Sequence, residues 1–195
     1  MDISKLREPG KLLVLEIGAN VKPQAQYIPE YSDGKARVIT LDVDPEMHPD
    51  VIGDAANLAE CIEGKVDGVF ASHVLEHFSY WQSMSVLKGW IDALEDGGML
   101  HVLVPSWEWA AREILSENPS PALYGHSFAG QVNRWDVHLA MFTMRRLRAM
   151  FEQLGLSVIR ARTGEYHLIA GDGKPYAAEQ HYICGVKGVP KLSKE

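Results

Sequence analysis

Cysteine is scarce in this sequence, which has only Cys61 and Cys184, far apart and outside any C-x-x-C pair. This usage favours free thiols in the reducing cytoplasm and argues against a cysteine-based zinc site. The sequence also lacks an apolar run of the length that a membrane-spanning helix needs, so we expect no membrane span. Glu16 interrupts the apolar run KLLVLEIGANV near the N-terminus, and no convincing cleavage site follows it. We therefore interpret this run as a strand and not as a signal peptide.

An excess of basic residues is absent as well. The formal net charge is −7, which argues against a nucleic-acid partner, because such proteins normally present a basic face. The remaining composition, 46% hydrophobic and 23% charged over 195 residues, is that of an ordinary globular protein. We expect one domain over residues 1–195, large enough to bury its own core. The sequence does not indicate an oligomeric state.

Short apolar runs alternate with helical patterns along the chain. Five runs predict buried strands, at residues 12–18, 36–44, 50–55, 66–72 and 98–105. Two more strands are predicted at residues 156–162 and 180–188, with no room between them for a crossover helix. We expect these two to pair as an antiparallel hairpin at a sheet edge. The alternation predicts an α/β fold with a doubly wound, mostly parallel sheet.

Two segments have a clear helical period. The segment 80–98 has four apolar residues on one face, and Gly97 is expected to stop it: Met84, Leu87, Ile91 and Leu94. The segment 142–155 has the same spacing, with Thr143 as the expected cap of its start and Gly155 at its end: Leu147, Met150, Phe151 and Leu154.

Small or polar residues follow four of the predicted parallel strands. Gly18 follows the first, Asp42 ends the second, Asp54 the third, and Ser72 and His73 the fourth. Each of these residues alone also fits an ordinary turn. In an open α/β sheet, however, ligands bind beyond the carboxyl ends of the strands. Gly18 would let a ligand approach the backbone, Asp42 would accept bonds from two ribose hydroxyls, and Asp54 would accept one from an adenine amino group.

Successive segments of the chain resemble the motifs of class I S-adenosylmethionine-dependent methyltransferases. They are VLEIGAN, VITLDVDP, VIGDAANL, VDGVFASHVLEHF and LEDGGMLHVLVPS, with matching spacing over residues 11–105. The later DVHLAMFTMRRLRAMFEQLGL is similar to the C-terminal part of small bacterial members often associated with polysaccharide or sugar pathways. The resemblance implies a Rossmann-like sheet of seven strands with the last strand antiparallel, and S-adenosylmethionine as the cofactor.

The resemblance also implies which residues contact the cofactor. Those positions are Glu16, Gly18, Ala19, Asn20, Asp42, Val43, Asp54, Ala55, Ser72 and His73. Residues 16–20 would meet the methionine part, Asp42 the ribose, and Asp54 the adenine end. Ser72 and His73 would lie at the edge of the methyl-transfer site. The family's loop usually reads Gly-x-Gly, whereas here an asparagine takes the place of the second glycine. Asparagine tolerates a left-handed backbone better than most residues, so we expect the loop to keep its shape.

The string His73-Val-Leu-Glu76-His77 has a second interpretation. Two histidines four apart on a helix, with a neighbouring glutamate, can bind zinc. Here the string directly follows a strand, and the residues after it leave room for one or two turns, while a third ligand would have to come from elsewhere. We therefore expect no metal. Glu76 and His77 fit capping and packing of the turn as well as catalysis, and His73 is the better catalytic candidate.

The acceptor is expected near residues 117–142, a long segment of weak periodicity that is typical of a functional loop or lid. Its polar and aromatic groups suit a small polar molecule such as a sugar, and the candidate substrate-binding residues are His126, Gln131, Trp135, Asp136 and His138. Alternatively, the aromatic groups pack the segment down and the polar groups face water. Methyl transfer can rely largely on in-line positioning, with His73 or His138 removing a proton.

Two other functions remain open. A strand, a glycine and an acidic residue about 20 positions later also describe a nicotinamide-dependent oxidoreductase. The full G-x-G-x-x-G is absent, since residues 18–23 read GANVKP, so this function ranks below methyl transfer. A protein that binds S-adenosylmethionine or its homocysteine product without turnover is the other alternative.

Overall fold

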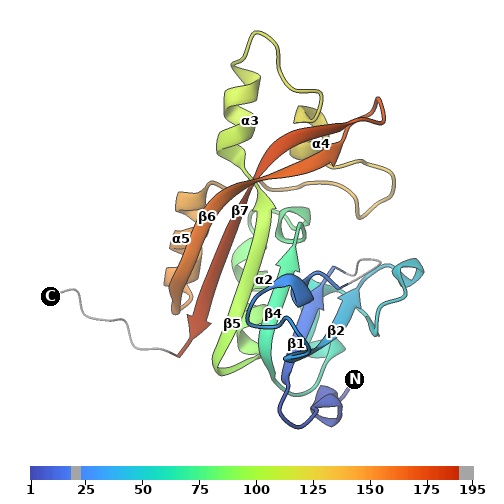
Figure 1. The fold of residues 1–195 in the computed structure, drawn as a ribbon, viewed down its shortest axis with the longest axis vertical. Helices are drawn as coiled ribbons and strands as arrows, with labels where there is room; N and C mark the ends of the chain where they lie inside the picture. The colour runs from blue at the N-terminus through green and yellow to red at the C-terminus, as the bar shows by residue number, and fades with distance from the viewer. Residues whose placement is uncertain (19–22, 189–195) are drawn as a thin grey trace, which may run out of the picture.

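The computed structural model describes residues 1–18 and 23–188. Ala19 and Asn20, both predicted to contact the cofactor, lie outside the described residues. The main element is a seven-stranded sheet with the strand order β3-β2-β1-β4-β5-β7-β6 (Figure 1). Its strands are β1 (Leu12–Ile17), β2 (Ala36–Asp42), β3 (Val51–Ile52), β4 (Val66–Ser72), β5 (Leu94–Pro105), β6 (Leu156–Ile169) and β7 (Pro175–Lys187).

The direction of the strands confirms the predicted fold class. Strands β1 to β5 pair in parallel, and β7 runs antiparallel to both β5 and β6. The C-terminal hairpin is therefore present, with β7 inserted beside β5 and β6 at the sheet edge. The strand order switches at β1, which lies between β2 and β4. A crevice beyond the carboxyl ends of β1 and β4 is the expected ligand site of such a sheet.

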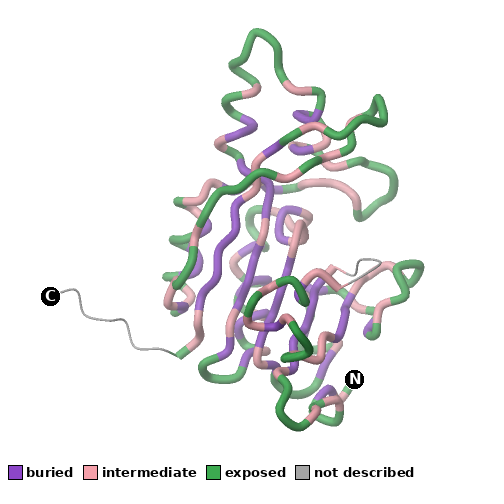
Figure 2. Tube along the Cα trace, in the orientation of Figure 1, coloured by how far each residue is buried: buried purple, intermediate pink, exposed green. Residues whose placement is uncertain are grey.

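Both faces of the central strands are covered, as their continuous apolar runs require. Leu13 and Leu15 of β1 join the core that contains α2 (Ser83–Asp92) and α5 (Met144–Gln153). Val14 points to the opposite face, where it packs with Tyr31 and Phe70. Figure 2 shows the buried residues concentrated in the central strands.

The helix predicted over 80–98 is shorter in the structure. It ends at Asp92, and Leu94 already belongs to β5, where it pairs with Val66 of β4. The helical period had placed Leu94 on the buried face of the helix, and it is indeed fully buried, but in the sheet. Strand pairing thus overrides the local period here. The fully buried Trp90, whose Nε1 donates to the Ala55 carbonyl at 2.9 Å, anchors the helix instead.

The second predicted helix is confirmed as α5. The Thr143 hydroxyl accepts a hydrogen bond from the backbone N–H of Arg146 at 3.1 Å, which is the expected cap. Gly155 follows the helix with φ +84°, a conformation that residues with a side chain rarely adopt.

Cys61 and Cys184 are both free.

The hairpin is longer than predicted and extends past the main sheet. Its outer part packs on α3 (Trp107–Ile114) and α4 (Leu123–Phe128), two helices that the sequence pattern did not indicate (Figure 1). We call α3, α4 and the outer part of the hairpin the arm. A small separate core holds the arm together: Trp109, Ala110, Ala122, Leu123 and Ala178. Among the described residues, no helix has the length and apolar character to cross a membrane.

Candidate active site

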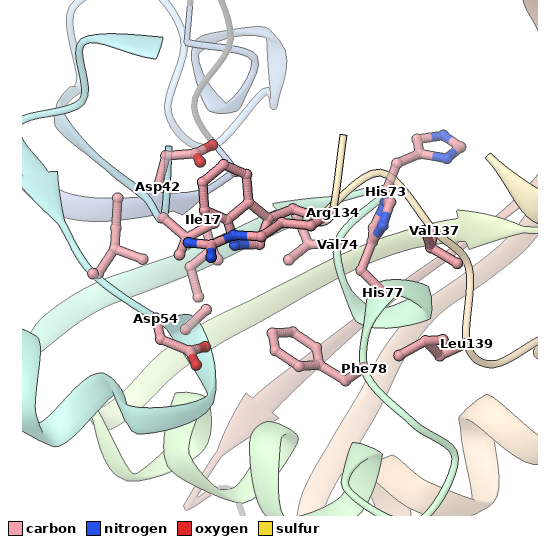
Figure 3. Close-up of a pocket in the computed structure, with 16 residues that line it drawn as sticks. Ile17, Asp42, Asp54, His73, Val74, His77, Phe78, Arg134, Val137 and Leu139 are labelled. Carbon is pink, nitrogen blue, oxygen red and sulfur yellow. The ribbon is translucent and has the colours of Figure 1, made fainter. Parts of the chain in front are cut away.

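A cavity of about 450 Å³ lies beyond the carboxyl ends of β1, β2, β3 and β4. We call it the strand-end cavity, and its size suits a small molecule or cofactor. It brings together most of the residues predicted to contact the cofactor: Gly18, Asp42, Val43, Asp54, Ala55 and His73. Figure 3 shows Asp42 and Asp54 on one side and His73 and His77 on the other.

Gly18 is required by the local geometry. Its φ is +83°, and a Cβ atom at this position would lie 2.6 Å from Cγ2 of Val74. A side chain would therefore strain the backbone and collide with the turn after β4. The absence of a side chain leaves the backbone at the end of β1 exposed to the cavity.

Glu16 does not line the cavity, although it was predicted to contact the cofactor. It is 1% exposed, and its two carboxylate oxygens accept hydrogen bonds from the backbone N–H groups of Gln24 and Ala25, both at 2.8 Å. Burial raises the pKa of Glu16, against the opposing effect of these two bonds. Its structural role is to hold the backbone at Gln24 and Ala25.

The two cavity carboxylates are oriented by the turns that follow their strands. Asp42 Oδ1 accepts from the backbone N–H of Asp44 at 2.8 Å, and Asp54 Oδ1 accepts from that of Ala56 at 2.8 Å. These local bonds fix each side chain as it leaves its strand. Two acceptor groups therefore reach the cavity from neighbouring strands.

Part of the segment 117–142, which the sequence analysis interpreted as a lid, lines the strand-end cavity. It contributes Arg134, Trp135, Val137 and Leu139 to the lining. The Arg134 guanidinium carbon lies 4.3 Å from the centre of the Trp135 ring, and the Arg134 side chain reaches across the cavity (Figure 3). The sequence pattern identified Trp135 but not Arg134, because a lone arginine in a weakly periodic segment resembles a solvated residue.

The other candidates in this segment lie elsewhere. Asp136 and Gln131 shape a turn, since the Gln131 N–H donates to the Asp136 carbonyl at 2.9 Å, and neither residue lines the strand-end cavity. His126 is fully buried: its Nε2 contacts the Ser106 carbonyl at 2.9 Å and its Nδ1 the Tyr166 hydroxyl at 3.1 Å. Burial lowers the pKa of His126 to about 4. Both ring nitrogens thus serve the internal structure.

His73 lies directly after β4 with a left-handed φ of 55°, whereas Ser72, the last residue of β4, does not line the cavity. One ring nitrogen of His73 lies 2.7 Å from Oε1 of Gln180, and the other lies 3.2 Å from Oε1 of Glu76. Burial disfavours the charged ring, but Glu76 and Gln180 outweigh it, so the pKa of His73 is raised. Gln180 comes from β7 and was not identified from the sequence.

Glu76 is fully buried in the turn after β4. Burial opposes its charged form, yet His73 and His138 outweigh this effect and lower the pKa of Glu76. Its backbone carbonyl accepts from the N–H groups of Leu139 and Ala140 at 2.8 and 3.1 Å, which ties the lid segment to this turn. As a result His138 lies beside Glu76 and His77, and one ligand atom from each of the three lies within 4.8 Å of the other two.

A second cavity of about 600 Å³ opens between the segment after β1 and the C-terminal hairpin. We call it the hairpin cavity. Gln180, which contacts His73, is part of its lining, together with Tyr27, Arg162 and Glu165. The His73–Gln180 contact therefore separates the two cavities. None of these hairpin residues was predicted from the sequence, because their contacts with the rest of the site come from parts of the chain far away in sequence.

Comparison with known proteins gives no matching family model and no matching curated protein. Solved structures do match. An S-adenosylmethionine-dependent methyltransferase from Methanosarcina mazei aligns with a TM-score of 0.61 at 13% identity, covering 96% of this chain and 99% of that one. The N-methyltransferase NodS from Bradyrhizobium japonicum, in complex with S-adenosyl-L-homocysteine, aligns with a TM-score of 0.58 at 12% identity, covering 96% and 82%.

TehB from Haemophilus influenzae is also similar, with a TM-score of 0.59, 11% identity and 94% of this chain covered. This chain spans only 59% of the TehB chain. At these identities the likeness establishes the fold, which is the fold of class I S-adenosylmethionine-dependent methyltransferases.

Proposed function

We propose that this protein binds S-adenosylmethionine in the strand-end cavity and transfers its methyl group to a small polar acceptor. One observation carries the proposal: Gly18, Asp42, Asp54 and His73, which the motifs assign to the cofactor, line a single cavity at the switch point of a sheet with the methyltransferase fold. A nicotinamide cofactor would not account for Asp54 and His73 in this cavity.

The residues of the cavity fit the parts of this cofactor. The Asp42 carboxylate offers acceptors for two ribose hydroxyls, and hydrogen bonds to a charged group are stronger than neutral ones. The motif assignment has Asp54 and Ala55 meet the adenine ring and the backbone of Gly18 meet the methionine part, and all three residues line this cavity. When bound, S-adenosylmethionine supplies an electrophilic methyl group on a positively charged sulfur.

We assign the acceptor to the hairpin cavity. Arg162, Glu165 and Gln180 give this cavity hydrogen-bonding groups, which suit a hydroxylated molecule such as a sugar. His73 lies between the two cavities and its ring is held by Gln180 and Glu76, so it remains our candidate for contact with the reacting acceptor atom. This assignment moves the acceptor from the lid, where the sequence placed it, to the hairpin.

Ligand binding tests the cofactor assignment. A ligand present at 100 times its dissociation constant stabilises a protein by about 2.7 kcal/mol. For a domain of this size we expect S-adenosylhomocysteine to raise the melting temperature by about 5–10 °C. NAD⁺ at the same concentration is the control, and we expect it to give no shift.

A shift with NAD⁺ and none with millimolar S-adenosylhomocysteine would overturn the assignment in favour of an oxidoreductase. If S-adenosylhomocysteine binds, turnover with a panel of sugars and other small hydroxylated acceptors comes next. Methylated product supports an enzyme, whereas binding without product from any acceptor supports a cofactor-binding protein.

A further inference from the structure

Glu76 and Glu16 are equally buried but differently satisfied. Both side chains are at most 1% exposed. Glu16 accepts two backbone hydrogen bonds, whereas neither carboxylate oxygen of Glu76 has a hydrogen-bond partner among the described residues. A buried carboxylate without hydrogen bonds is costly unless it is paired with a positive charge or coordinates a metal. One oxygen of Glu76, Oε1, lies 3.2 Å from the Nδ1 atom of His73.

His138 presents a second electron pair to Glu76. The Nδ1 atom of His138 lies 3.1 Å from the backbone carbonyl of His126, and because a carbonyl only accepts, that Nδ1 must carry the proton. In the neutral ring the Nε2 atom is then unprotonated, and it lies 3.9 Å from Oε1 of Glu76. A lone pair thus faces a carboxylate oxygen with no proton between them.

His77 completes the group. Its Nδ1 atom is buried without a hydrogen-bond partner in the described structure, and its ring lies edge-on to that of His138, with 4.9 Å between the ring centres. One ligand atom each from Glu76, His77 and His138 lies within 4.8 Å of the others. Three side chains that can each offer a metal ligand atom therefore converge at one point.

We propose that Glu76, His77 and His138 bind one divalent transition-metal ion, with Zn²⁺ as the first candidate. Two imidazoles and one carboxylate are a ligand set typical of zinc sites that keep a fourth position open. Nitrogen ligands favour Zn²⁺ and its transition-metal neighbours over Mg²⁺ and Ca²⁺. The hydrogen bond from His138 to a backbone carbonyl is the kind of outer contact that fixes a metal-binding histidine.

On a tetrahedral zinc ion, with bonds of about 2.0–2.2 Å, two ligand atoms lie about 3.3–3.6 Å apart. The ligand atoms of the three side chains lie within 4.8 Å of one another, and His138 Nε2 lies 3.9 Å from Glu76 Oε1. Binding an ion therefore requires the side chains to close by up to about 1.5 Å. The sequence alone led us to expect no metal because no third ligand was evident, and the structure supplies His138. His77 also lines the strand-end cavity, so the ion would lie at its wall.

Metal binding is measured directly on the full-length protein. We treat the purified protein with a chelator, remove the chelator, and titrate Zn²⁺ by calorimetry, with Mg²⁺ as the comparison. We expect one Zn²⁺ per chain, at least tenfold tighter than Mg²⁺, and Co²⁺ at the same site with the visible absorption of a low-coordinate ion. The His77→Ala and His138→Ala variants should each lose at least tenfold in Zn²⁺ affinity.

His167→Ala is the matched control. His167 also lies near a carboxylate, 3.9 Å from Glu165, but both side chains are well exposed. Its loss should leave Zn²⁺ affinity unchanged. Because Glu76 is fully buried, its replacement endangers the fold, so the test uses the half-buried His77 instead, with circular dichroism of each metal-free variant to verify folding.

Three results would overturn the proposal: no stoichiometric Zn²⁺ in the wild-type protein, Zn²⁺ affinity unchanged in folded His77→Ala or His138→Ala protein, or an equal loss in His167→Ala. The first of these would leave the His73–Glu76 ion pair as the reason for the buried carboxylate. The proposed function stands or falls separately, on the melting temperature of metal-free protein with S-adenosylhomocysteine.

Discussion

The N-terminal half, up to the end of β5, and the C-terminal half, residues 106–188, build their parts of the site in different ways. In the first, Gly18, Asp42 and Asp54 follow consecutive parallel strands, and the sheet itself brings their side chains to one edge. In the second, long-range contacts place the functional groups. His138 is positioned by the backbone bonds that the next two residues, Leu139 and Ala140, donate to Glu76. Gln180 is positioned by the pairing of β7 with β5.

This difference separates what local sequence can specify from what it cannot. A strand-end residue reaches the cavity as soon as the sheet forms, so its place depends on neighbours in the chain. A residue of the lid or the hairpin reaches the site only after the arm has packed. We therefore expect the first half to carry cofactor affinity and the second to carry acceptor binding and the proposed metal site.

The largest expected effect concerns the seam where the two halves meet. His101 of β5 is fully buried, and its Nδ1 lies 2.9 Å from the hydroxyl of Tyr182 on β7. Burial lowers the pKa of His101 to about 4, with Glu30 opposing and Arg160 supporting the shift. The unfolded chain, with the ordinary pKa of 6.5, takes up a proton that the folded protein excludes. Stability is therefore full above pH 6.5 and falls as the pH drops toward 4.

The size follows from proton linkage. The contribution of His101 that is lost should be about 2 kcal/mol at pH 5 and about 3 kcal/mol at pH 4. Urea unfolding of wild-type and His101→Gln protein at pH 7.5 and pH 5 measures it, with the difference in pH dependence as the readout. Between pH 7.5 and pH 5, the free energy of unfolding of the variant should fall by about 2 kcal/mol less than that of the wild-type protein. Equal pH dependence in both proteins would show that folding does not keep the proton off His101.

Asp42→Ala sharpens the comparison from the side of the N-terminal half. Hydrogen bonds to a charged group contribute about 1.5–3 kcal/mol, so S-adenosylhomocysteine should bind roughly ten- to a hundredfold more weakly to the variant. Calorimetry gives the affinity, and the melting temperature without ligand should change little. Asp92→Ala is the control, because that carboxylate pairs with Lys88 on the exposed surface of α2.

A purely structural role of Asp42 predicts the opposite result. If Asp42 only shapes the turn before Pro45, the variant is less stable and binds with unchanged affinity. A normally folded Asp42→Ala protein with wild-type affinity would remove the ribose assignment, and with it the main support for the cofactor pose.

The sequence predicted the N-terminal half well because its signals are local. The runs that became β1, β2 and β4 ended where Gly18, Asp42 and His73 begin the cavity. Local signals also explain the success at α5, whose cap Thr143 lies three residues from its partner Arg146. The helical period misled only at Leu94, where pairing with Val66 decides the outcome.

The C-terminal half was harder because its contacts are remote in the chain. Nothing near His138 indicates that Glu76 will bind the backbone beside it, and nothing near Gln180 indicates His73. Arg134 reaches the cavity from a loop without periodicity. The sequence identified His138 and Trp135 as residue types suited to a site, but their partners became visible only in the folded chain.

The smallest expected effect is that of Gln180→Ala, which tests whether the two halves divide the work. Within residues 1–18 and 23–188, the Gln180 side chain makes one hydrogen bond, to His73. It lines the hairpin cavity but not the strand-end cavity. Its loss should cost about 0.5–1.5 kcal/mol of stability.

We expect the affinity of the Gln180→Ala variant for S-adenosylhomocysteine to change by less than about threefold, because Asp42, Asp54 and Gly18 are untouched. A threefold change corresponds to only about 0.7 kcal/mol. The same calorimetry and urea unfolding measure both quantities. The control variant is Gln82→Ala, because Gln82 is exposed and lines neither cavity. A loss of cofactor affinity as large as that of Asp42→Ala would break the comparison, since the hairpin would then hold the cofactor as well as the acceptor.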